Sequence, residues 1–445
     1  MYMNKLYAFI IMLSFSFCTL STDSANEKNK SMMMMSLAYG MGSAGYVFIS
    51  NTGKLDIVKH TNMSDSTYSG SIPFSVNPGE VACTANYHCY IGFSSTGDIA
   101  VIDASITSTS TPSLIQTVTA QGKNPVHMYT HSDTNTVWVL NDGGTTTTTG
   151  CTFDSSVTII KDASGNVNPA TALKNICLDQ GHHKMAFSTS PNRAFISSIT
   201  GNTIKVIDND PTSATYLTLL STITLAAVNG VVAGPHGLAY SSVTKKIYNS
   251  NQTQGTVLEI DPTSYSQTII NTTKSGTAYV SEDGKYFVTK GSVTGTATTG
   301  TAGAITGKII TVRLSDKTVS SLDLPDVSPD NFFISPAGNR VFVATSLGYG
   351  KIPLYKDKLE VIDTTDPTSL KVLKEVTIGA TQKNHRGTVG ITHGSALMNI
   401  YIPSDVDGNL YVLDANGNIS KTISLGGAPS GINSVSIGHL GTHAH

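Results

Sequence analysis

The sequence has few charged residues and, after its first residues, no long apolar segment. Charged side chains make up 13% of the 445 residues, and the formal net charge is −2. The lack of a basic stripe excludes nucleic acid as an expected partner, and the lack of a polybasic patch excludes an anionic membrane surface. No later segment approaches the ~20 apolar residues of a spanning helix, so we expect no transmembrane segment in the mature chain. No Cys-x-x-Cys-His occurs, which excludes covalently attached c-type haem.

The first residues have the pattern of a secretory signal peptide. Lys5 precedes an apolar run from Leu6 to Leu13, which is too short to cross a bilayer, and small polar residues follow. An N-terminal anchor left in place is the alternative. We expect the mature chain to be secreted, extracellular, at the cell surface or periplasmic. The expected segments are a signal peptide (1–25), a polar, Met-rich leader (26–43), a folded domain (44–438) and a His-containing tail (439–445).

Four cysteines remain when Cys18 is removed with the signal peptide. An even number of cysteines in an exported protein predicts two disulfides. Cys83 lies at the end of one expected strand and Cys89 at the start of the next, so a hairpin brings them together. Cys151 and Cys177 are then expected to pair across the long insertion of the following unit.

The chain consists of a repeated unit, best seen from Gly234 to Asp261, with three expected strands and two polar turns. Such a hairpin array cannot bury its own apolar faces, so it needs neighbours of the same kind. The apolar second strand recurs in register as Tyr90-Ile-Gly-Phe, Val137-Trp-Val-Leu, Ala194-Phe-Ile-Ser, Ile247-Tyr-Asn-Ser, Tyr286-Phe-Val-Thr, Val341-Phe-Val-Ala and Ile400-Tyr-Ile-Pro.

The two ends of the repeat complement each other. Residues Pro429 to Ile437 supply only a first strand, whereas the N-terminal end begins with a second strand, Gly45 to Asn51, and a third, Lys54 to Val58. Pairing these fragments closes a ring and removes an open strand edge. We therefore predict an all-β fold, a single β-propeller of eight blades closed by the N-terminal strands and the C-terminal strand. Seven blades are the alternative.

The unit Pro-x-Gly-x-Ala-x-Ser…Lys-x-x-Tyr-Val-x-Asn…Ile-x-Val-Ile-Asp resembles the YVTN-type repeats of secreted and surface-layer β-propellers. The likeness is best from Pro235 to Asp261 and extends over roughly Gly45 to Ile437. It implies the fold and leaves the activity open. A more distant likeness to the propeller domains of nitrous-oxide reductase and cd1-type nitrite reductases implies histidines at the entrance of inner strands. In those enzymes such histidines hold copper or face a haem, but no segment here resembles their cupredoxin or cytochrome domains.

Histidines gather at the expected inner strands, which line the central channel of a propeller. His236 and His183 take equivalent positions in an ungapped alignment, His182 precedes His183, His127 lies one residue past its ring position, and Asp330 supplies a carboxylate. Neutral imidazole suits copper, zinc, nickel or iron. These five residues are the candidate metal ligands, with copper or zinc as the candidate metal. The alternative is that they are channel-mouth residues hydrogen-bonded to backbone or water.

Two functions remain open from the sequence. The polar, low-charge exterior and the Thr/Gly-rich inserts at Thr145 to Gly150 and Gly291 to Gly307 favour a non-catalytic binding or scaffold protein. Its partner would be a protein or a surface polymer that contacts the propeller face and loops. The alternative is a metal- or cofactor-dependent redox protein, of copper or haem type, that uses the histidines at the channel mouth. Acid, base and nucleophile candidates cannot be separated from the many turn residues, so no catalytic residue is assigned.

Overall fold

The computed structural model divides into residues 1–43 and a second unit, Ala44–His445, which is described here by itself. The structure describes residues 45–62, 65–105, 111–144, 150–181, 183–272, 276–295, 305–345, 358–378, 389–393, 396–404, 407–425 and 434–437. The expected signal peptide, leader and His-containing tail lie outside these residues. Among the described residues no helix is long and apolar enough to cross a membrane.

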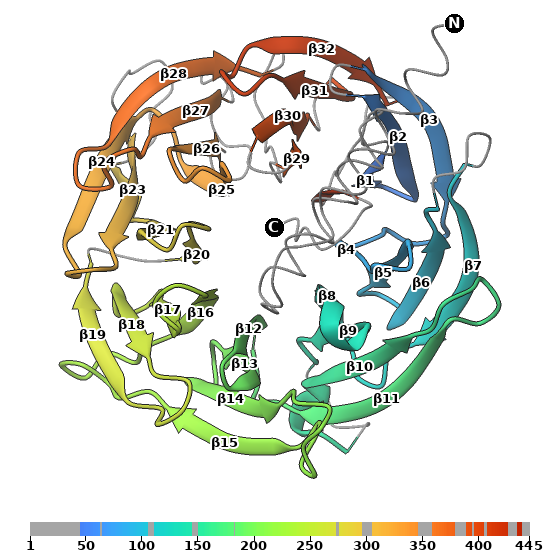
Figure 1. Cartoon of the computed structure of the whole chain (residues 1–445), viewed down its shortest axis with the longest axis horizontal. Coiled ribbons are helices and arrows are strands. Elements are labelled where there is room, and N and C mark those ends of the chain that lie inside the picture. The colour runs from blue at the N-terminus through green and yellow to red at the C-terminus, as the bar shows by residue number, and fades with distance from the viewer. Residues whose placement is uncertain are drawn as a thin grey trace, which may run out of the picture. The chain divides into compact units, whose positions relative to one another are not determined.

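Eight antiparallel sheets form a ring, seven of four strands and one of five (Figure 1). The first four sheets are β3 (Asp65–Pro73), β2 (Lys54–Asn62), β1 (Gly45–Asn51) and β33 (Ser434–Ile437); β4 (Val81–Cys83), β5 (His88–Phe93), β6 (Asp98–Asp103) and β7 (Ser113–Thr119); β8 (Pro125–His131), β9 (Thr136–Asn141), β10 (Ser156–Asp162) and β11 (Ala170–Cys177); and β12 (His183–Thr189), β13 (Asn192–Ser198), β14 (Thr203–Asp208) and β15 (Leu219–Thr224).

The other four sheets are β16 (Pro235–Ser241), β17 (Lys246–Asn251), β18 (Thr256–Ile260) and β19 (Gln267–Asn271); β20 (Tyr279–Val280), β21 (Tyr286–Lys290), β22 (Thr294–Gly295), β23 (Ile305–Arg313) and β24 (Val319–Pro325); β25 (Pro329–Ile334), β26 (Arg340–Thr345), β27 (Lys358–Asp363) and β28 (Lys371–Thr377); and β29 (Val389–His393), β30 (Ala396–Pro403), β31 (Asn409–Leu413) and β32 (Ile419–Ser424). The helical content of the described chain is two short 3-10 turns, η1 (Ser132–Thr134) and η2 (Thr152–Asp154). The all-β propeller with eight blades is thus confirmed.

The ring closes through the two ends of the repeat, as predicted. Strand β33 pairs antiparallel with β1, from Val47 opposite Ile437 to Ser50 opposite Ser434. The last strand therefore completes the sheet that the N-terminal strands begin, and the edge of β1 is covered.

One insert is more ordered than expected. Thr294–Gly295, within the Thr/Gly-rich insert, forms the short strand β22 and pairs with the first residues of β23. Strand β23 begins at Ile305, which still belongs to the insert from Gly291 to Gly307. The insert therefore extends its sheet to five strands, because its backbone groups find partners along the lengthened β23.

The core lies between neighbouring sheets. The second strands are buried on both faces, as in β9, whose six residues are all buried, and this explains their continuous apolar sequences. Trp138 of β9 packs edge-on against Phe187 of β12, with ring centroids 5.5 Å apart, in one cluster with Ile196 of β13. Each sheet therefore buries its apolar faces against the next sheet around the ring.

Serine hydroxyls on second strands connect neighbouring sheets. The Ser250 hydroxyl accepts the Gly237 N–H of its own sheet at 3.0 Å and donates to the Gly276 carbonyl of the next sheet. Ser197 likewise donates to the His236 carbonyl of the following sheet at 3.0 Å. A Cβ on Gly237 would lie 2.5 Å from the Ala278 nitrogen, so this repeat glycine allows the inner strands to approach closely.

Candidate functional site

The inner strands start at one face of the ring and carry the histidines that the sequence singled out. Figure 1 shows β4, β8, β12 and β16 next to one another around the centre. His183 pairs opposite Ser198, but His236 is the extra residue of a bulge between Pro235 and Gly237. Each histidine still directly precedes the residue opposite a second-strand serine, Lys184 opposite Ser197 and Gly237 opposite Ser250, so the bulge changes only how His236 itself pairs. A metal site shared by the two histidines stays a prediction. A bulge inserts one residue without a sequence signal, and an ungapped alignment cannot detect it.

His183 is buried and both of its ring nitrogens are engaged. Its Nδ1 lies 3.1 Å from Oδ1 of Asp142, and its Nε2 donates to the backbone carbonyl of Asp179 at 2.7 Å. The backbone N–H of His183 also donates to Asp142, at 3.3 Å. In this arrangement a metal ion would have to replace one of these hydrogen bonds.

His127 belongs to a polar group that we call the mouth network, consisting of Glu80, His127 and Lys184. Nδ1 of His127 lies 2.7 Å from Oε1 of Glu80 and 3.2 Å from Nζ of Lys184. Glu80 directly precedes β4, His127 lies in β8, and Lys184 is the second residue of β12. Three consecutive sheets therefore each contribute one side chain to the network.

The surroundings of Lys184 weaken its positive charge. Burial lowers the pKa of this amine, while the carboxylates of Glu80 and Asp142 act in the opposite direction and Lys290 adds to the lowering. Acidic and basic groups thus lie together where the inner strands begin. Such a group can exchange hydrogen bonds with a polar ligand, since it offers both donors and acceptors.

Glu80 and Lys184 were not predicted as site residues, although the sequence carries a signal for them. Both stand two residues after the start of their repeat units, at Pro78 and His182, as His127 does after Pro125. This position lies one residue after the ring position of His236.

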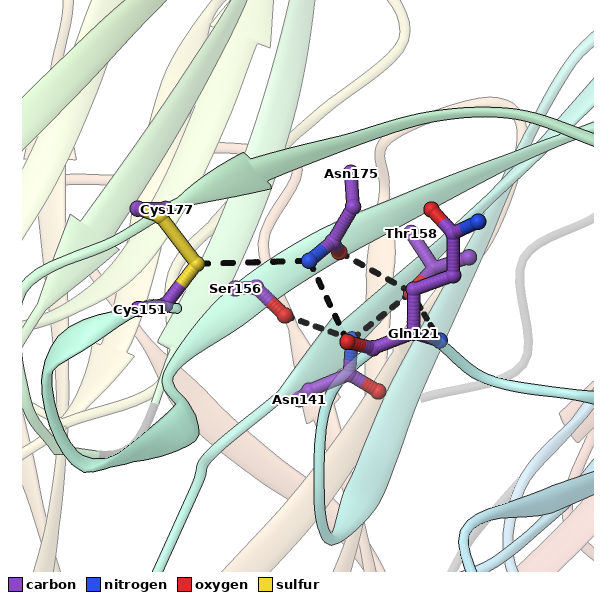
Figure 2. Close-up of a disulfide and its surroundings, with 7 residues drawn as sticks. All are labelled: Gln121, Asn141, Cys151, Ser156, Thr158, Asn175 and Cys177. Carbon is purple, nitrogen blue, oxygen red and sulfur yellow. Dashed lines mark hydrogen bonds between the residues drawn. A yellow bond between two sulfur atoms is a disulfide. The ribbon is translucent and has the colours of Figure 1, made fainter. Parts of the chain in front are cut away.

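The mouth network lies next to a part of the β8–β11 sheet that a disulfide and side-chain hydrogen bonds cross-link. Figure 2 shows the Cys151–Cys177 disulfide beside Asn175, whose amide donates to the Gln121 carbonyl at 3.2 Å. Asn175 also accepts the Thr158 hydroxyl, and Thr158 in turn accepts the Asn141 amide at 3.0 Å (Figure 2). Asn141 immediately precedes Asp142, the partner of His183. The disulfide therefore stabilises the strands from which Asp142 projects.

Both predicted disulfides are present. The disulfide between Cys83 and Cys89 joins the end of β4 to β5. The disulfide between Cys151 and Cys177 joins the segment before β10 to the end of β11. Gly143 follows Asp142 with a φ of +79°, and a Cβ there would lie 2.2 Å from the Phe153 carbonyl oxygen. The turn after Asp142 therefore requires glycine.

The five-residue metal set stays a prediction. His182 lies outside the described residues, and Asp330 is placed in β25 without a description of its side chain. No three or more His, Cys, Asp or Glu side chains that could hold a metal ion come together in the described part of the chain. The structure brings His127 beside Glu80 and His183 beside Asp142, two separate pairs.

Comparison with known proteins supports the fold. No family model and no curated protein matches the sequence. AztD from Citrobacter koseri is similar in structure, with a TM-score of 0.59 and 15% identity over 88% of this chain and 97% of that one. The shared feature is the β-propeller. Sqt1 from Saccharomyces cerevisiae has a TM-score of 0.58 at 10% identity, covering 80% of this chain and 89% of that one. A Lactobacillus plantarum protein has a TM-score of 0.51 at 15% identity, covering 76% and 98%.

At these sequence identities, structural similarity to another β-propeller does not indicate a shared activity, because the same fold supports many unrelated functions. The YVTN-type likeness remains a resemblance of repeat residues. Function has to be argued from the side chains of this chain.

Proposed function

We propose that the chain is an exported, non-catalytic binding or scaffold protein of the extracellular space, cell surface or periplasm. Its partner, a protein or a surface polymer, contacts the face where the inner strands begin. The observation that carries this proposal is the mouth network, in which His127 lies within hydrogen-bond distance of both Glu80 and Lys184, and the three residues come from three sheets. Two disulfides favour an oxidising compartment.

The proposal is tested by retention of the tag-free mature chain on two purified probes, the surface polymer and the secreted protein fraction of the source cells. The test variant is Glu80→Gln/His127→Gln/Lys184→Met, which removes the charges of the network and keeps side-chain bulk. We expect one probe to retain the wild type at low salt and to retain the variant at least tenfold less, since salt screens charge contacts with a partner. Equal retention of both proteins would place the contact elsewhere.

A matched control tests whether any lost lysine weakens retention. Lys317 pairs with Glu259 at 3.0 Å in the turn before the outer strand β24. Lys317→Met should be retained like the wild type. Circular dichroism must show the same sheet content in all three proteins before their retention is compared.

A metal-dependent redox role is the second candidate, because His127 and His183 lie on the neighbouring inner strands β8 and β12. Copper would be held by ligands drawn from the five predicted residues, since imidazole nitrogens suit it, whereas zinc at the same ligands would have no redox role. Elemental analysis of the tag-free chain should then find one metal per chain, which His183→Ala/His236→Ala removes. Unchanged metal content in this variant would contradict the proposed ligand set.

A further inference from the structure

We propose that His88 is a doubly protonated imidazolium that acts as a pH-sensitive latch between the β4–β7 sheet and the β8–β11 sheet. The latch consists of Asp162, His88, Asn166 and Asp103. It joins the end of β10 to the start of β5, two strands whose contacting residues are 74 positions apart in sequence.

The buried end of the latch is the carboxylate of Asp162. It accepts hydrogen bonds from the Thr84 hydroxyl at 2.6 Å, the Asn86 amide at 2.8 Å, Nδ1 of His88 at 2.7 Å and the Tyr90 hydroxyl at 2.7 Å. These four donors stand at alternate positions along one segment of the neighbouring sheet. An ionised carboxylate can only accept, so Nδ1 of His88 carries a proton.

The hydrogen-bond partners of Nε2, the other imidazole nitrogen of His88, determine whether a second proton is present. Nε2 of His88 lies 3.2 Å from Oδ1 of Asn166, and the amide nitrogen of Asn166 donates to Oδ2 of Asp103 at 2.5 Å. A turned amide would place its oxygen against the carboxylate oxygen of Asp103, and two acceptors repel each other, so the amide oxygen of Asn166 faces His88. Nε2 must then also carry a proton, and the imidazole is charged.

The charges around His88 agree with this assignment. Burial lowers the pKa of His88, but the hydrogen bonds to Asp162 and Asn166, with the negative charges of Asp162 and Asp103, more than offset it and raise the pKa above the ordinary 6.5. Burial likewise raises the pKa of Asp162, and the donors His88, Thr84 and Tyr90 reverse this and hold it below 3.8. Tyr90, the remaining titratable neighbour, stays protonated because its own pKa is raised.

The sign of the pH dependence follows from these directions. A raised pKa of His88 in the folded chain stabilises the fold fully below about 6.5, and this contribution is lost as the pH rises through the folded value. The lowered pKa of Asp162 contributes above about 3.8 and is lost as the pH falls. The latch is therefore strongest between pH values of about 3.8 and 6.5 and weakens as the pH rises through the raised pKa of His88. Asn166 is exposed, so protons can reach Nε2 from solvent.

The deciding experiment is nitrogen-15 NMR of the full mature chain, with histidine labelled and His88 assigned by the variant His88→Gln. At pH 7 we expect both ring nitrogens of His88 in the protonated range, and Asn166→Ala should lower the titration midpoint. A neutral tautomer of His88 at pH 7 would overturn the proposal, whatever the variants do.

Thermal unfolding provides the second readout. The melting temperature of the wild type should exceed that of His88→Gln by several degrees at pH 6, and the difference should shrink by pH 9. A difference that is constant over this range would mean a packing role alone and would contradict the latch. His131 is the matched control, because its Nδ1 lies 2.9 Å from the Thr134 hydroxyl, which can accept or donate and demands no charge.

Discussion

Aspartate side chains close most of the turns that lead to the outer strands. The residues concerned end third strands or directly follow them, and their Oδ1 atoms accept a backbone N–H two residues later. They are Asp103, Asp208, Asp261, Asp363 and Asp414. The repeated aspartate of the unit is therefore a turn-closing residue, an Asx turn, and five carboxylates of the chain need no catalytic explanation.

Asp261 allows the turn-closing role to be measured. Its Oδ1 accepts the backbone N–H groups of Thr263 and Ser264 at 2.8 Å, and its Oδ2 pairs with Lys246 at 2.6 Å. Asp261→Ala should lower the free energy of unfolding by about 1–2 kcal/mol, since two N–H groups lose their acceptor. Asp261→Asn keeps Oδ1 and should lose less than about 1 kcal/mol, the usual value of an exposed ion pair. Equal losses in urea unfolding would show that the ion pair matters more than the turn.

Glu360 is a second residue with a measurable pH effect. It is buried in β27, opposite Glu375 in β28. Burial is the main reason that its pKa rises to about 7, Glu375 adds to the rise, and Lys358 opposes it. The folded chain therefore prefers the protonated acid, and the contribution of Glu360 to stability falls as the pH rises from about 4.5 through 7.

Glu360→Gln should make the protein more stable at pH 8, by on the order of 1–3 kcal/mol. At pH 4.5 the variant and the wild type should be nearly equally stable, because the acid is then largely protonated. Urea unfolding at both pH values measures the difference. A variant that is less stable at pH 8 would show that Glu360 is held as a carboxylate.

At the scale of strands, serine hydroxyls join three of the sheets to the next one, through carbonyls in or just before its inner strand. The hydroxyls of Ser50, Ser197 and Ser250 each donate to a carbonyl in the following sheet, at Gly79, His236 and Gly276. A small hydroxyl residue near the end of the second strand therefore serves the contact between blades. It explains why serine recurs there within an otherwise apolar run.

Ser250→Ala should lower the free energy of unfolding by about 1–3 kcal/mol, because the buried Gly237 N–H and Gly276 carbonyl both lose their partner. Ser320→Ala is the matched control. Its hydroxyl also reaches the next sheet, at the Thr368 carbonyl, but from the partly exposed outer strand β24. We expect a loss of less than about 0.5 kcal/mol there. Similar losses would argue against a special role for the inner strands.

At the scale of the whole molecule, stability depends on closure of the ring. Strand β33 is the inner strand of the sheet that β1 to β3 begin, and no other described strand covers that edge of β1. An open edge next to Val47 and Ile49 would expose unpaired backbone groups beside apolar side chains. Closure therefore protects the molecule against association through this edge.

Truncation after Leu425 should unfold the chain or make it associate, because it removes β33. Truncation after Ile437 keeps the pairing with β1 and is the matched control, which should behave like the full-length chain. Light scattering with size-exclusion chromatography measures the size, and thermal unfolding measures cooperativity. An unchanged size and melting temperature in the shorter chain would contradict closure by β33.

The sequence by itself determined the fold of this protein. The second strands lie between two neighbouring sheets and are buried on both faces. Each unit therefore carries a continuous apolar run that recurs in register along the sequence. The complementary end fragments predicted the closure, and the even number of cysteines predicted both disulfides. The outer strands carry a weaker sequence pattern because they are half exposed, as β7 shows, and packing does not dictate their residues.

Only the tertiary structure decided the candidate site and the latch. A bulge makes His236 an extra residue between the paired Pro235 and Gly237, whereas His183 pairs opposite Ser198. Glu80, His127 and Lys184 meet because three sheets stand side by side, and Asp162 reaches His88 across a sheet boundary. Local patterns record which face of a strand is buried. Which polar groups meet depends on how neighbouring sheets are placed against each other, and no single unit of the repeat contains that information.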